Sequence, residues 1–497
     1  MKEFGLFING KWEAAEGGKT ADTINPATEA PWAKVAVASR NDVKKAVAAA
    51  KKSFDSGVWR KKSKEERAKV LESIAAAIME RAEELAAAEA RDGGGTIRKA
   101  SFMDVPGTAG TFQEFARVLR ASEEEQVFEE TVPVPSKNII RAEPIGVCAG
   151  IVPWNFPMIM ASWKIAPAIA AGNSIVLKPA SVTPVTALMI ADICKSAGVP
   201  DGVVNVVSGP GAEVGEELAT NADVGKIAFT GSTEVGRRIM QLASGTIKKV
   251  TLELGGKSPN IILDDADLDT AAMGALFGTF MHQGQICESG TRVLVPQKLY
   301  DTFIDKMIAG SKRITIGDTM DMMTTMGPLV SAAQLKTVGG YVDAGKSEGA
   351  ECVLGGDRPA NMKKGYYFNP TIFAGVNNKM RIAQEEIFGP VVAMIPYKTE
   401  EEAISIANDS MYGLGGAVWS KNKDRALGVA RQIQTGTVWI NDYHMISPRF
   451  PFGGYKQSGV GRELGPWGLA AYQEIKHIHV GESVPADQKI YFGALFN

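Results

Sequence analysis

The residue in this chain best suited to covalent chemistry is Cys287, at the centre of His282-Gln-Gly-Gln-Ile-Cys-Glu-Ser-Gly-Thr-Arg292. A thiol among glycines and small polar residues, where backbone amides can approach closely, is a candidate nucleophile. Because a free thiol is mostly protonated near neutral pH, other residues must activate it. The other cysteines, Cys148, Cys194 and Cys352, lie in apolar helix or strand patterns and are predicted to be packing residues.

Two residues elsewhere in the chain could assist that thiol. Glu253 ends an apolar strand and precedes two glycines, which places it at a strand's carboxyl end, where open sheets hold their sites; a plain surface glutamate is the alternative. Asn155, in Pro153-Trp-Asn-Phe-Pro157, could donate to a developing oxyanion or simply close a turn. Histidine is a poorer candidate for the base, because only four are present and His282 is geometrically unspecific.

Glycine-rich turns offer a second kind of site. Gly209-Pro-Gly-Ala-Glu-Val-Gly215 is one residue too long for the GxGxxG fingerprint, and Gly231-Ser-Thr-Glu-Val-Gly236 is followed by two arginines instead of Lys-Ser/Thr. The second of them nevertheless joins an apolar strand to a helix start, where free amides could bind a pyrophosphate. An ordinary strand-helix turn is the alternative.

The hydrophobic pattern predicts the secondary structure around these residues. Six apolar runs between residues 145 and 265 alternate with helices at 160–171 and 184–197, which predicts a parallel sheet covered by helices. A second βα-like region covers about 290–440. Helices dominate 41–120, where Ser63-Lys-Glu-Glu66 has capping-box spacing, and Asn9-Gly10 indicates a hairpin turn.

Composition excludes several classes of function. With 497 residues the chain should form two to four domains, and a net charge of -2 gives no reason to expect nucleic acid or an anionic membrane as a partner. The cysteines have no CxxC or Cys/His spacing, so neither a disulfide framework nor a metal site is predicted. No secretory signal or membrane-spanning run is recognisable, which favours a reduced, cytoplasmic enzyme.

Taken together, these segments resemble the NAD(P)-dependent aldehyde dehydrogenase superfamily nearly end to end. The matching motifs, in the family's order, are Pro153-Trp-Asn-Phe-Pro157, Leu177-Lys-Pro-Ala180, Phe229-Thr-Gly-Ser-Thr-Glu-Val-Gly236, Leu252-Glu-Leu-Gly-Gly-Lys-Ser-Pro259, Gly284-Gln-Ile-Cys287, Glu385-Glu-Ile-Phe-Gly-Pro390, Pro451-Phe-Gly-Gly-Tyr-Lys-Gln-Ser-Gly459 and Gly461-Arg-Glu-Leu-Gly465. Each is weak alone, but the ordered set makes coincidence negligible.

The resemblance implies an α/β fold in three parts. A Rossmann-like nucleotide-binding domain would comprise 1–124 and 145–255, and an α/β catalytic domain 256–455. A small β oligomerisation arm, at 125–144 and 473–497, would pair with another subunit in a dimer or tetramer.

The resemblance also implies residue roles. Cys287 would attack the aldehyde carbon, Asn155 with the backbone amide of Cys287 would form the oxyanion hole, and Glu253 would activate water to hydrolyse the thioester that remains after hydride transfer. Lys164 and Glu463 match residues near this site, Glu463 in a proton path. No metal is expected. The residues that match cofactor contacts are Ile151, Pro153, Trp154, Lys178, Ser181, Gly211, Phe229, Gly231, Ser232, Val235, Leu254, Glu386 and Phe388.

Ser181 departs from the family pattern in a way that bears on the cofactor. NAD-preferring relatives often carry a glutamate there, which bonds the ribose hydroxyls. Removing a carboxylate about 5 Å from a 2′-phosphate would relieve roughly 3 kcal/mol of repulsion at an intermediate dielectric. NADP should therefore be tolerated or preferred.

The matching substrate-tunnel positions are mostly apolar, which suggests aliphatic or aromatic aldehydes. Glu288 and His444 are the polar exceptions: a Glu288 that faces the tunnel would favour a cationic or hydroxylated aldehyde, and one that faces away would be structural. The tunnel positions are Phe156, Met160, Trp163, Met281, Ile286, Glu288, His444, Ile446 and Phe452.

Three alternatives to a hydrolytic dehydrogenase of apolar aldehydes stay open. Within the family they are an aminoaldehyde or hydroxyaldehyde dehydrogenase and a CoA-acylating semialdehyde dehydrogenase, although acylating relatives typically lack the glutamate found here as Glu253. From another class, an enzyme fold reused for binding after loss of activity is conceivable. The presence of Cys287, Asn155 and Glu253 together argues against it.

Overall fold

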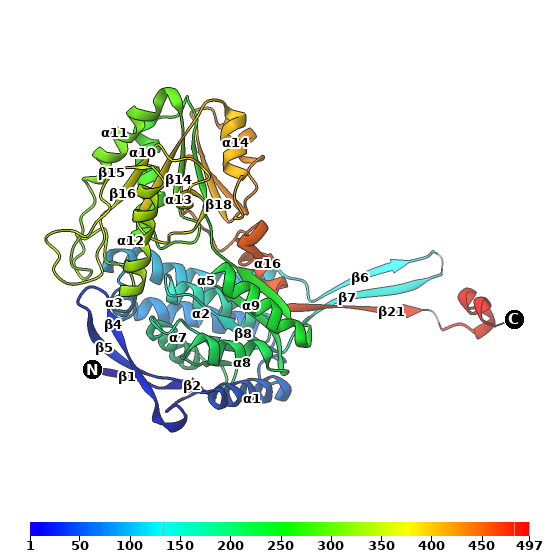
Figure 1. Cartoon of the computed structure of the whole chain (residues 1–497). Helices are drawn as coiled ribbons and strands as arrows, with labels where there is room; N and C mark the ends of the chain where they lie inside the picture. The colour runs from blue at the N-terminus through cyan, green and yellow to red at the C-terminus, as the bar shows by residue number, and fades with distance from the viewer. Residues whose placement is uncertain (133, 482, 497) are drawn as a thin grey trace.

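The computed structural model describes residues 1–132, 134–481 and 483–496. Two α/β bodies lie one above the other, and a thin three-stranded arm projects from the lower one (Figure 1). The body built mostly from the first half of the chain holds an eight-stranded sheet, and the other holds a seven-stranded sheet.

The eight-stranded sheet has the predicted doubly wound character. Its order is β20-β12-β11-β8-β9-β10-β2-β3, and the five central strands from β12 to β10 are all parallel. Parallel strands buried on both faces require near-continuous apolar runs, which is the pattern that predicted them. The central strands are β8 (Val147–Ile151), β9 (Ser174–Lys178), β10 (Val204–Val206), β11 (Val224–Thr230) and β12 (Lys249–Glu253).

Shorter strands close the edges of this body. The hairpin of β2 (Leu6–Ile8) and β3 (Lys11–Glu13) turns at Asn9 and Gly10, both at positive φ, as the Asn-Gly signal predicted. β20 (Gly459–Val460) pairs antiparallel with β12 at the opposite edge. A separate sheet is formed by β1 (Lys2–Phe4), β4 (Thr20–Asn25) and β5 (Ala30–Ala36).

Helices cover both faces of the first sheet. The helix α2 begins with the predicted capping box, in which Ser63 accepts from the Glu66 amide and the Glu66 carboxylate accepts from the Ser63 amide. The helices of this body are α1 (Arg40–Ser56), α2 (Lys64–Glu80), α3 (Ala82–Gly93), α4 (Ile97–Lys99), α5 (Val105–Ala121), α6 (Pro157–Ala170), α7 (Val185–Ser196), α8 (Glu216–Thr220), α9 (Thr233–Ala243) and α16 (Gly465–Ala470).

The seven-stranded sheet begins with the sixth apolar run of the 145–265 region, which pairs with β14 and β18 and not with the first sheet. All its strands are parallel except β15 at one edge. In sheet order they are β15 (Glu351–Leu354), β16 (Thr371–Ala374), β17 (Val391–Tyr397), β14 (Arg292–Pro296), β13 (Pro259–Ile262), β18 (Gly415–Trp419) and β19 (Thr437–Ile440). The helices are α10 (Leu268–Phe280), α11 (Tyr300–Ser311), α12 (Ala332–Ser347), α13 (Arg381–Gln384), α14 (Glu400–Asn408) and α15 (Lys423–Ala430).

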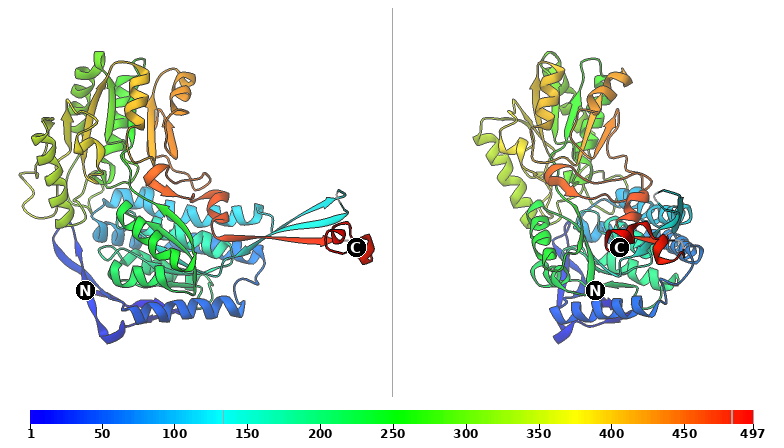
Figure 2. Two further views of the ribbon diagram at one scale, coloured as in Figure 1. Left: turned by 45° about the vertical axis from the view of Figure 1, so that its right-hand side comes forward. Right: turned by 90° about the vertical axis from the view of Figure 1, so that its right-hand side faces the viewer.

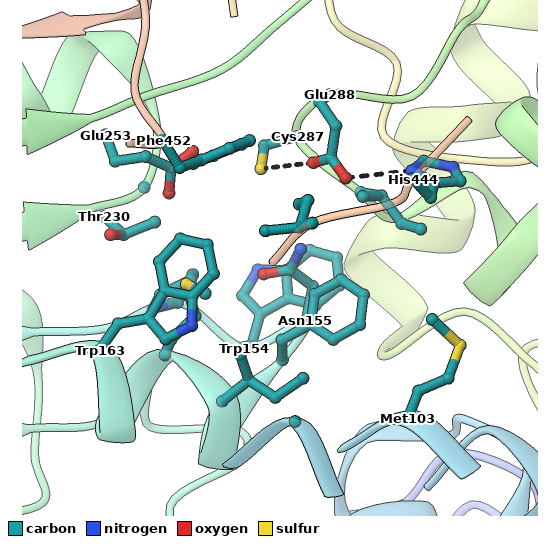
Figure 3. A pocket seen from close by; sticks show the side chains of 18 of the residues that line it. Met103, Trp154, Asn155, Trp163, Thr230, Glu253, Cys287, Glu288, His444 and Phe452 are labelled. Carbon is teal, nitrogen blue, oxygen red and sulfur yellow. Dashed lines mark hydrogen bonds and ion pairs between the residues drawn. The ribbon is translucent and has the colours of Figure 1, made fainter. Parts of the chain in front are cut away.

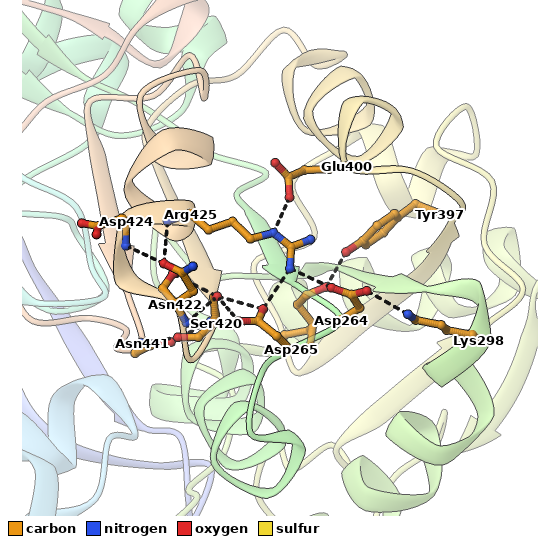
Figure 4. A network of polar contacts seen from close by, with 11 residues as sticks. Asp264, Asp265, Lys298, Tyr397, Glu400, Ser420, Asn422, Asp424, Arg425 and Asn441 are labelled. Atoms are coloured by element: carbon orange, nitrogen blue, oxygen red, sulfur yellow. Dashed lines mark hydrogen bonds and ion pairs between the residues drawn. The ribbon is translucent and has the colours of Figure 1, made fainter.

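A polar network ties together the segments that follow β13 and β18 (Figure 4). The Ser420 hydroxyl lies 2.8 and 2.7 Å from the two carboxylate oxygens of Asp265, and Arg425 donates to Asp264 and Asp265 at 2.7 and 3.2 Å. Arg425 also reaches Glu400 on α14 at 2.8 Å. The network joins two strand ends to two helices on the side of the sheet away from the first body.

The arm consists of β6 (Glu125–Glu130), β7 (Ser136–Pro144) and β21 (Gln473–Gly481), with β7 in the middle. It extends well beyond both bodies, with the C-terminal residues at its far end (Figure 2). Apolar side chains on it are exposed, among them Phe128 at 51% and Ile475 at 66%.

No helix in the described part of the chain is long and apolar enough to span a bilayer. The same residues contain no cluster of His, Cys, Asp or Glu arranged to hold a metal ion.

Candidate active site

A cavity of about 530 Å³ opens where the two bodies meet, and it brings together most of the predicted site (Figure 3). Cys287, Glu253 and Asn155 all line it, although they come from different segments: the α10–β14 loop, the end of β12 and the β8–α6 loop. All nine predicted tunnel residues line it as well: Phe156, Met160, Trp163, Met281, Ile286, Glu288, His444, Ile446 and Phe452.

An unusual backbone holds the loop that carries Cys287. His282, Gln283 and Gly284 have consecutive positive φ values of 49°, 59° and 69°. Gly284 suits this turn because it allows positive φ freely, and because a Cβ there would lie 2.2 Å from the Gly389 carbonyl oxygen. The Gln283 side chain fixes the turn by donating to the carbonyls of Gly94 and Pro328 at 2.9 and 2.8 Å. The strain costs free energy that the surrounding structure must offset, as is common at functional sites.

Cys287 is partly buried, and its thiol donates a hydrogen bond to Glu288 Oε2 at 3.1 Å. Burial raises the pKa of the Cys287 thiol well above its usual value, and the carboxylates of Glu253 and Glu288 raise it further. The thiol in this state is therefore protonated, and attack on a carbonyl needs a group that takes its proton.

Glu253 lies at the carboxyl end of β12, as its position in the sequence predicts. Its side chain is 2% exposed, and within the described residues neither carboxylate oxygen has a hydrogen-bond partner. Burial raises the pKa of Glu253 to about 8, with a further contribution from the charge of Glu463. A carboxylate in this state can act as a base at a pH not far above neutral.

Asn155 is held in the short segment before α6. Its side-chain amide donates to the Gln285 carbonyl at 2.8 Å, which links this segment to the cysteine loop. An amide nitrogen carries two hydrogens, so the second can still serve as a donor in the cavity.

Lys164 and Glu463 are brought together but lie behind the cavity wall. The Lys164 ammonium forms an ion pair with Glu463 and donates to the Thr230 hydroxyl at 2.8 Å. Thr230 lines the cavity, whereas neither member of the pair does. Their 299-residue separation shows that only the fold creates this contact.

Several of the residues predicted to contact the cofactor line the same cavity. The partly buried Glu386 accepts a hydrogen bond from the Gly256 amide at 3.0 Å, and desolvation of its carboxylate raises its pKa to about 7. Phe388 meets Trp154 edge to face, with ring centroids 5.1 Å apart. The predicted cofactor residues that line the cavity are Pro153, Trp154, Gly231, Ser232, Leu254, Glu386 and Phe388.

The remaining predicted cofactor residues do not line this cavity: Ile151, Lys178, Ser181, Gly211, Phe229 and Val235. They lie near the carboxyl ends of the central strands, in the segments that follow or, for Val235, in the first turn of α9. Lys178 ends β9, and burial lowers its pKa to about 8; its ammonium donates to the Pro179 carbonyl at 2.9 Å. The Ser181 hydroxyl donates to the Gly209 carbonyl at 2.8 Å.

These residues fit a dinucleotide. Ser232 caps α9 by accepting from the Val235 amide at 3.3 Å, which leaves other amides of the first helical turn free for an anion. Gly231 lets the backbone pass close to Phe229, since a Cβ would lie 2.6 Å from that ring. The amides at the start of α9 can bind a pyrophosphate, and the Glu386 carboxylate can bind ribose hydroxyls. Open α/β sheets commonly bind nucleotides beside the carboxyl ends of their strands in this way.

The sequence left the orientation of Glu288 open. In the structure Glu288 is part of the cavity lining, and its carboxylate points to His444, another lining residue. Its side chain is buried, and Oε1 lies 3.0 Å from His444 Nδ1 while Oε2 accepts from the thiol. Burial raises the pKa of Glu288, but the hydrogen bond and charge of His444, with the hydrogen bond from Cys287, bring it below its usual value. The carboxylate is already paired with His444, so it is not a free anion that awaits a cationic aldehyde.

The sequence reasoning missed one wall of the cavity. The π-helical turn Ala100–Asp104 and the start of α5 contribute Phe102, Met103, Pro106, Gly107 and Thr111. Helical periodicity predicts helices within 41–120 that have a buried face, but it does not show that this face meets a cavity.

Comparisons with known proteins identify the family of the chain. The profile of the aldehyde dehydrogenase family matches residues 12–478. A betaine aldehyde dehydrogenase from Bacillus subtilis is 46% identical over 476 residues, covering 95% of this chain and 96% of that protein. The NAD+ complex of an aldehyde dehydrogenase from Bacillus cereus superposes with a TM-score of 0.94 at 44% identity and 97% coverage of both chains. A betaine aldehyde dehydrogenase from Staphylococcus aureus in complex with NAD+ gives 0.94 at 40% identity, with 97% and 95% coverage.

The family match covers nearly the whole chain, and the relatives are well above 30% identical. The predicted fold is therefore confirmed, as is the predicted activity: aldehyde oxidation with hydride transfer to a nicotinamide cofactor. The chain belongs to the aldehyde dehydrogenase family.

Proposed function

We propose that this dehydrogenase is hydrolytic and releases a free carboxylic acid. The observation that carries the proposal is Glu253: a buried carboxylate with no hydrogen-bond partner among the described residues, in the same cavity as the Cys287 thiol. A base next to the acyl-cysteine is what hydrolysis by water needs. Transfer to a thiol cosubstrate such as CoA has no such requirement.

The residue roles follow the reaction. The Cys287 sulfur attacks the aldehyde carbon, and the oxygen that becomes negative is stabilised by the free N–H of Asn155 and the Cys287 backbone amide. Bound NAD(P) supplies the acceptor for the hydride that leaves this carbon. Glu253 then takes a proton from water, which attacks the thioester and frees the thiol. Lys164 stabilises the end of β11 by donating to the Thr230 hydroxyl, and Glu463 pairs with Lys164. Protons released by Glu253 leave the site along a path that includes this pair.

The substrate we propose is an apolar aliphatic or aromatic aldehyde. Most of the tunnel side chains are hydrocarbon or aromatic, and the one carboxylate among them is paired with His444. A quaternary-ammonium aldehyde is the second candidate. Two relatives are named as betaine aldehyde dehydrogenases, and the rings of Trp163 and Phe452, 5.4 Å apart in the cavity, could stabilise a cation.

For the cofactor, we propose that NADP is used as well as NAD. Ser181 places no charge beside the adenosine ribose, and two cations lie in the same region: Lys178 ends β9, and Arg40 reaches the Ala212 carbonyl at 3.4 Å. Introducing the family's glutamate with Ser181→Glu should lower kcat/KM for NADP by roughly 100-fold, since the repulsion is about 3 kcal/mol, and leave NAD little changed.

We propose the domain division 1–124 with 145–255, 256–455, and an oligomerisation arm of 125–144 with 473–497. Exposed apolar side chains on the arm support its pairing with a second subunit in a dimer or tetramer. The four cysteines are all free, as expected in a reducing compartment, which supports a cytoplasmic location.

A panel of short aliphatic, long aliphatic, aromatic and quaternary-ammonium aldehydes, assayed with NAD and with NADP in the presence and absence of CoA, tests these proposals. We expect acid formation without CoA and the highest kcat/KM for apolar aldehydes. Product formation that depends on CoA would refute the hydrolytic proposal. A clear preference for the quaternary-ammonium substrate would select the second candidate.

A further inference from the structure

The contact between Glu288 and the catalytic thiol is a feature that the proposed roles do not use. The Cys287 sulfur lies 3.1 Å from Glu288 Oε2, within reach for proton transfer, while Oε1 lies 3.0 Å from His444 Nδ1. The two carboxylate oxygens thus connect the sulfur to the imidazole, as the dashed lines in Figure 3 show.

His444 is fixed in place to make this contact. Its backbone has a φ of 59°, which is uncommon for a residue other than glycine. Its ring lies against Phe277 and Tyr443, at centroid distances of 5.5 and 4.8 Å, and Nε2 lies 3.1 Å from the Gly278 carbonyl oxygen. Both ring nitrogens thus lie within hydrogen-bonding distance of oxygen atoms. The hydrogen bond and charge of His444 lower the pKa of the buried Glu288.

The two carboxylates near the thiol differ in what their surroundings favour. Glu253 is buried without a partner, so its neutral form is favoured, whereas His444 favours the ionised form of Glu288. Two carboxylates whose pKa values are shifted in opposite directions commonly serve as acid and base in different steps of a reaction. Of the two, Glu288 is the carboxylate whose pKa is lowered, and its Oε2 accepts a hydrogen bond from the thiol at 3.1 Å.

We propose that Glu288 is the general base for the first step, the attack of the Cys287 thiol on the aldehyde, and that His444 is the residue that positions Glu288 and keeps it ionised. As the S–C bond forms and the C=O π bond opens to an oxyanion, the S–H bond breaks and its proton passes to Glu288 Oε2. The product is a cysteine thiohemiacetal anion beside a neutral Glu288, with all charges conserved. Glu253 then stays available for the water that hydrolyses the thioester.

This assignment rests on the proposed hydrolytic function, and rapid kinetics can separate the two steps. We expect Glu288→Gln to slow the first-turnover burst of NADH roughly 100-fold, the usual effect of losing a general base. We expect Glu253→Gln to keep a fast burst of one equivalent and lose steady-state turnover. Glu288→Asp should recover part of the burst rate. Glu351→Gln, which alters an exposed carboxylate on β15, is the matched control.

The pH dependence of the burst distinguishes a base from a structural residue. The titratable groups that face Glu288 are His444 and Tyr443 from the segment after β19, Cys287 beside it and Glu253 from β12. His444→Gln keeps a donor to Glu288 but removes the positive charge, so the acidic limb of the burst-rate profile should move to higher pH. In Glu288→Gln that limb should disappear.

Several outcomes would overturn the assignment. A Glu288→Gln burst as fast as that of the wild type, or faster, would show that the carboxylate does not take the thiol proton. An acidic limb unmoved by His444→Gln would refute the positioning role, even if Glu288→Gln failed to fold or to bind NAD. A wild type that forms no NADH from any aldehyde would overturn the proposed function together with this assignment.

Discussion

Replacing Glu253 with glutamine should make the protein more stable, and more so as the pH rises. Glu253 is 2% exposed and its carboxyl oxygens have no hydrogen-bond partner among the described residues, so its charged form is destabilised in the folded state. Its pKa rises from 4.5 to about 8. At about 1.4 kcal/mol per tenfold change in proton affinity, ionised Glu253 costs the folded state up to about 5 kcal/mol.

The sign follows from which state binds the proton. Below pH 4.5 both the folded and the unfolded chain hold it, and Glu253 has no effect. Between 4.5 and 8 the unfolded chain has released the proton and the folded chain still holds it, so the free energy of unfolding falls with rising pH. Above about 8 the loss is complete. Glutamine does not titrate, so the advantage of the variant should grow across this window and then level off.

Thermal melts at pH 5, 7 and 9 would measure the effect. With an unfolding entropy of about 2.1 cal/mol/K per residue, 497 residues give about 1 kcal/mol per degree. The Tm advantage of Glu253→Gln should therefore be small at pH 5 and reach about 3–5 °C at pH 9. The exposed Glu351→Gln is the control. Equal Tm differences at pH 5 and pH 9 would refute the reasoning, because only titration of a buried carboxylate makes the difference depend on pH.

Three further substitutions test other parts of the structure. Lys164→Met should lower the free energy of unfolding by about 3–5 kcal/mol in denaturant titrations, since it leaves the buried Glu463 without its cation; a loss below about 1 kcal/mol would contradict a functional ion pair there. Gly255→Ala should raise KM for NAD about tenfold, because the new Cβ would lie 2.2 Å from Glu386 Oε2 and displace that carboxylate. Gly340 has open space around it, so Gly340→Ala is the control and should leave KM unchanged. Ser420→Ala removes the hydroxyl that bonds Asp265 at 2.7–2.8 Å and should destabilise the protein by about 1–3 kcal/mol; no change in the denaturation midpoint would show that Asp265 is satisfied without it.

Much of the fold could be predicted from local patterns, because local interactions produce it. The Asn9-Gly10 turn and the Ser63–Glu66 capping box need only neighbouring residues, and both form as predicted. The buried parallel strands reveal themselves by continuous apolar runs. Glu253 could be placed at a strand's carboxyl end because it follows such an apolar run and precedes two glycines. The order of the motifs then identified the family without any tertiary information.

Contacts between residues far apart in the chain could not be predicted, because they form only when the chain folds. His444 reaches Glu288 across 156 positions, and Lys164 reaches Glu463 across 299. The sequence showed a glutamate after the nucleophile but not where its carboxylate points. That direction depends on how the segment after β19 packs against the cysteine loop. Met103 entered the cavity wall for a similar reason, since helical periodicity shows that a helix has a buried face but not what it is buried against.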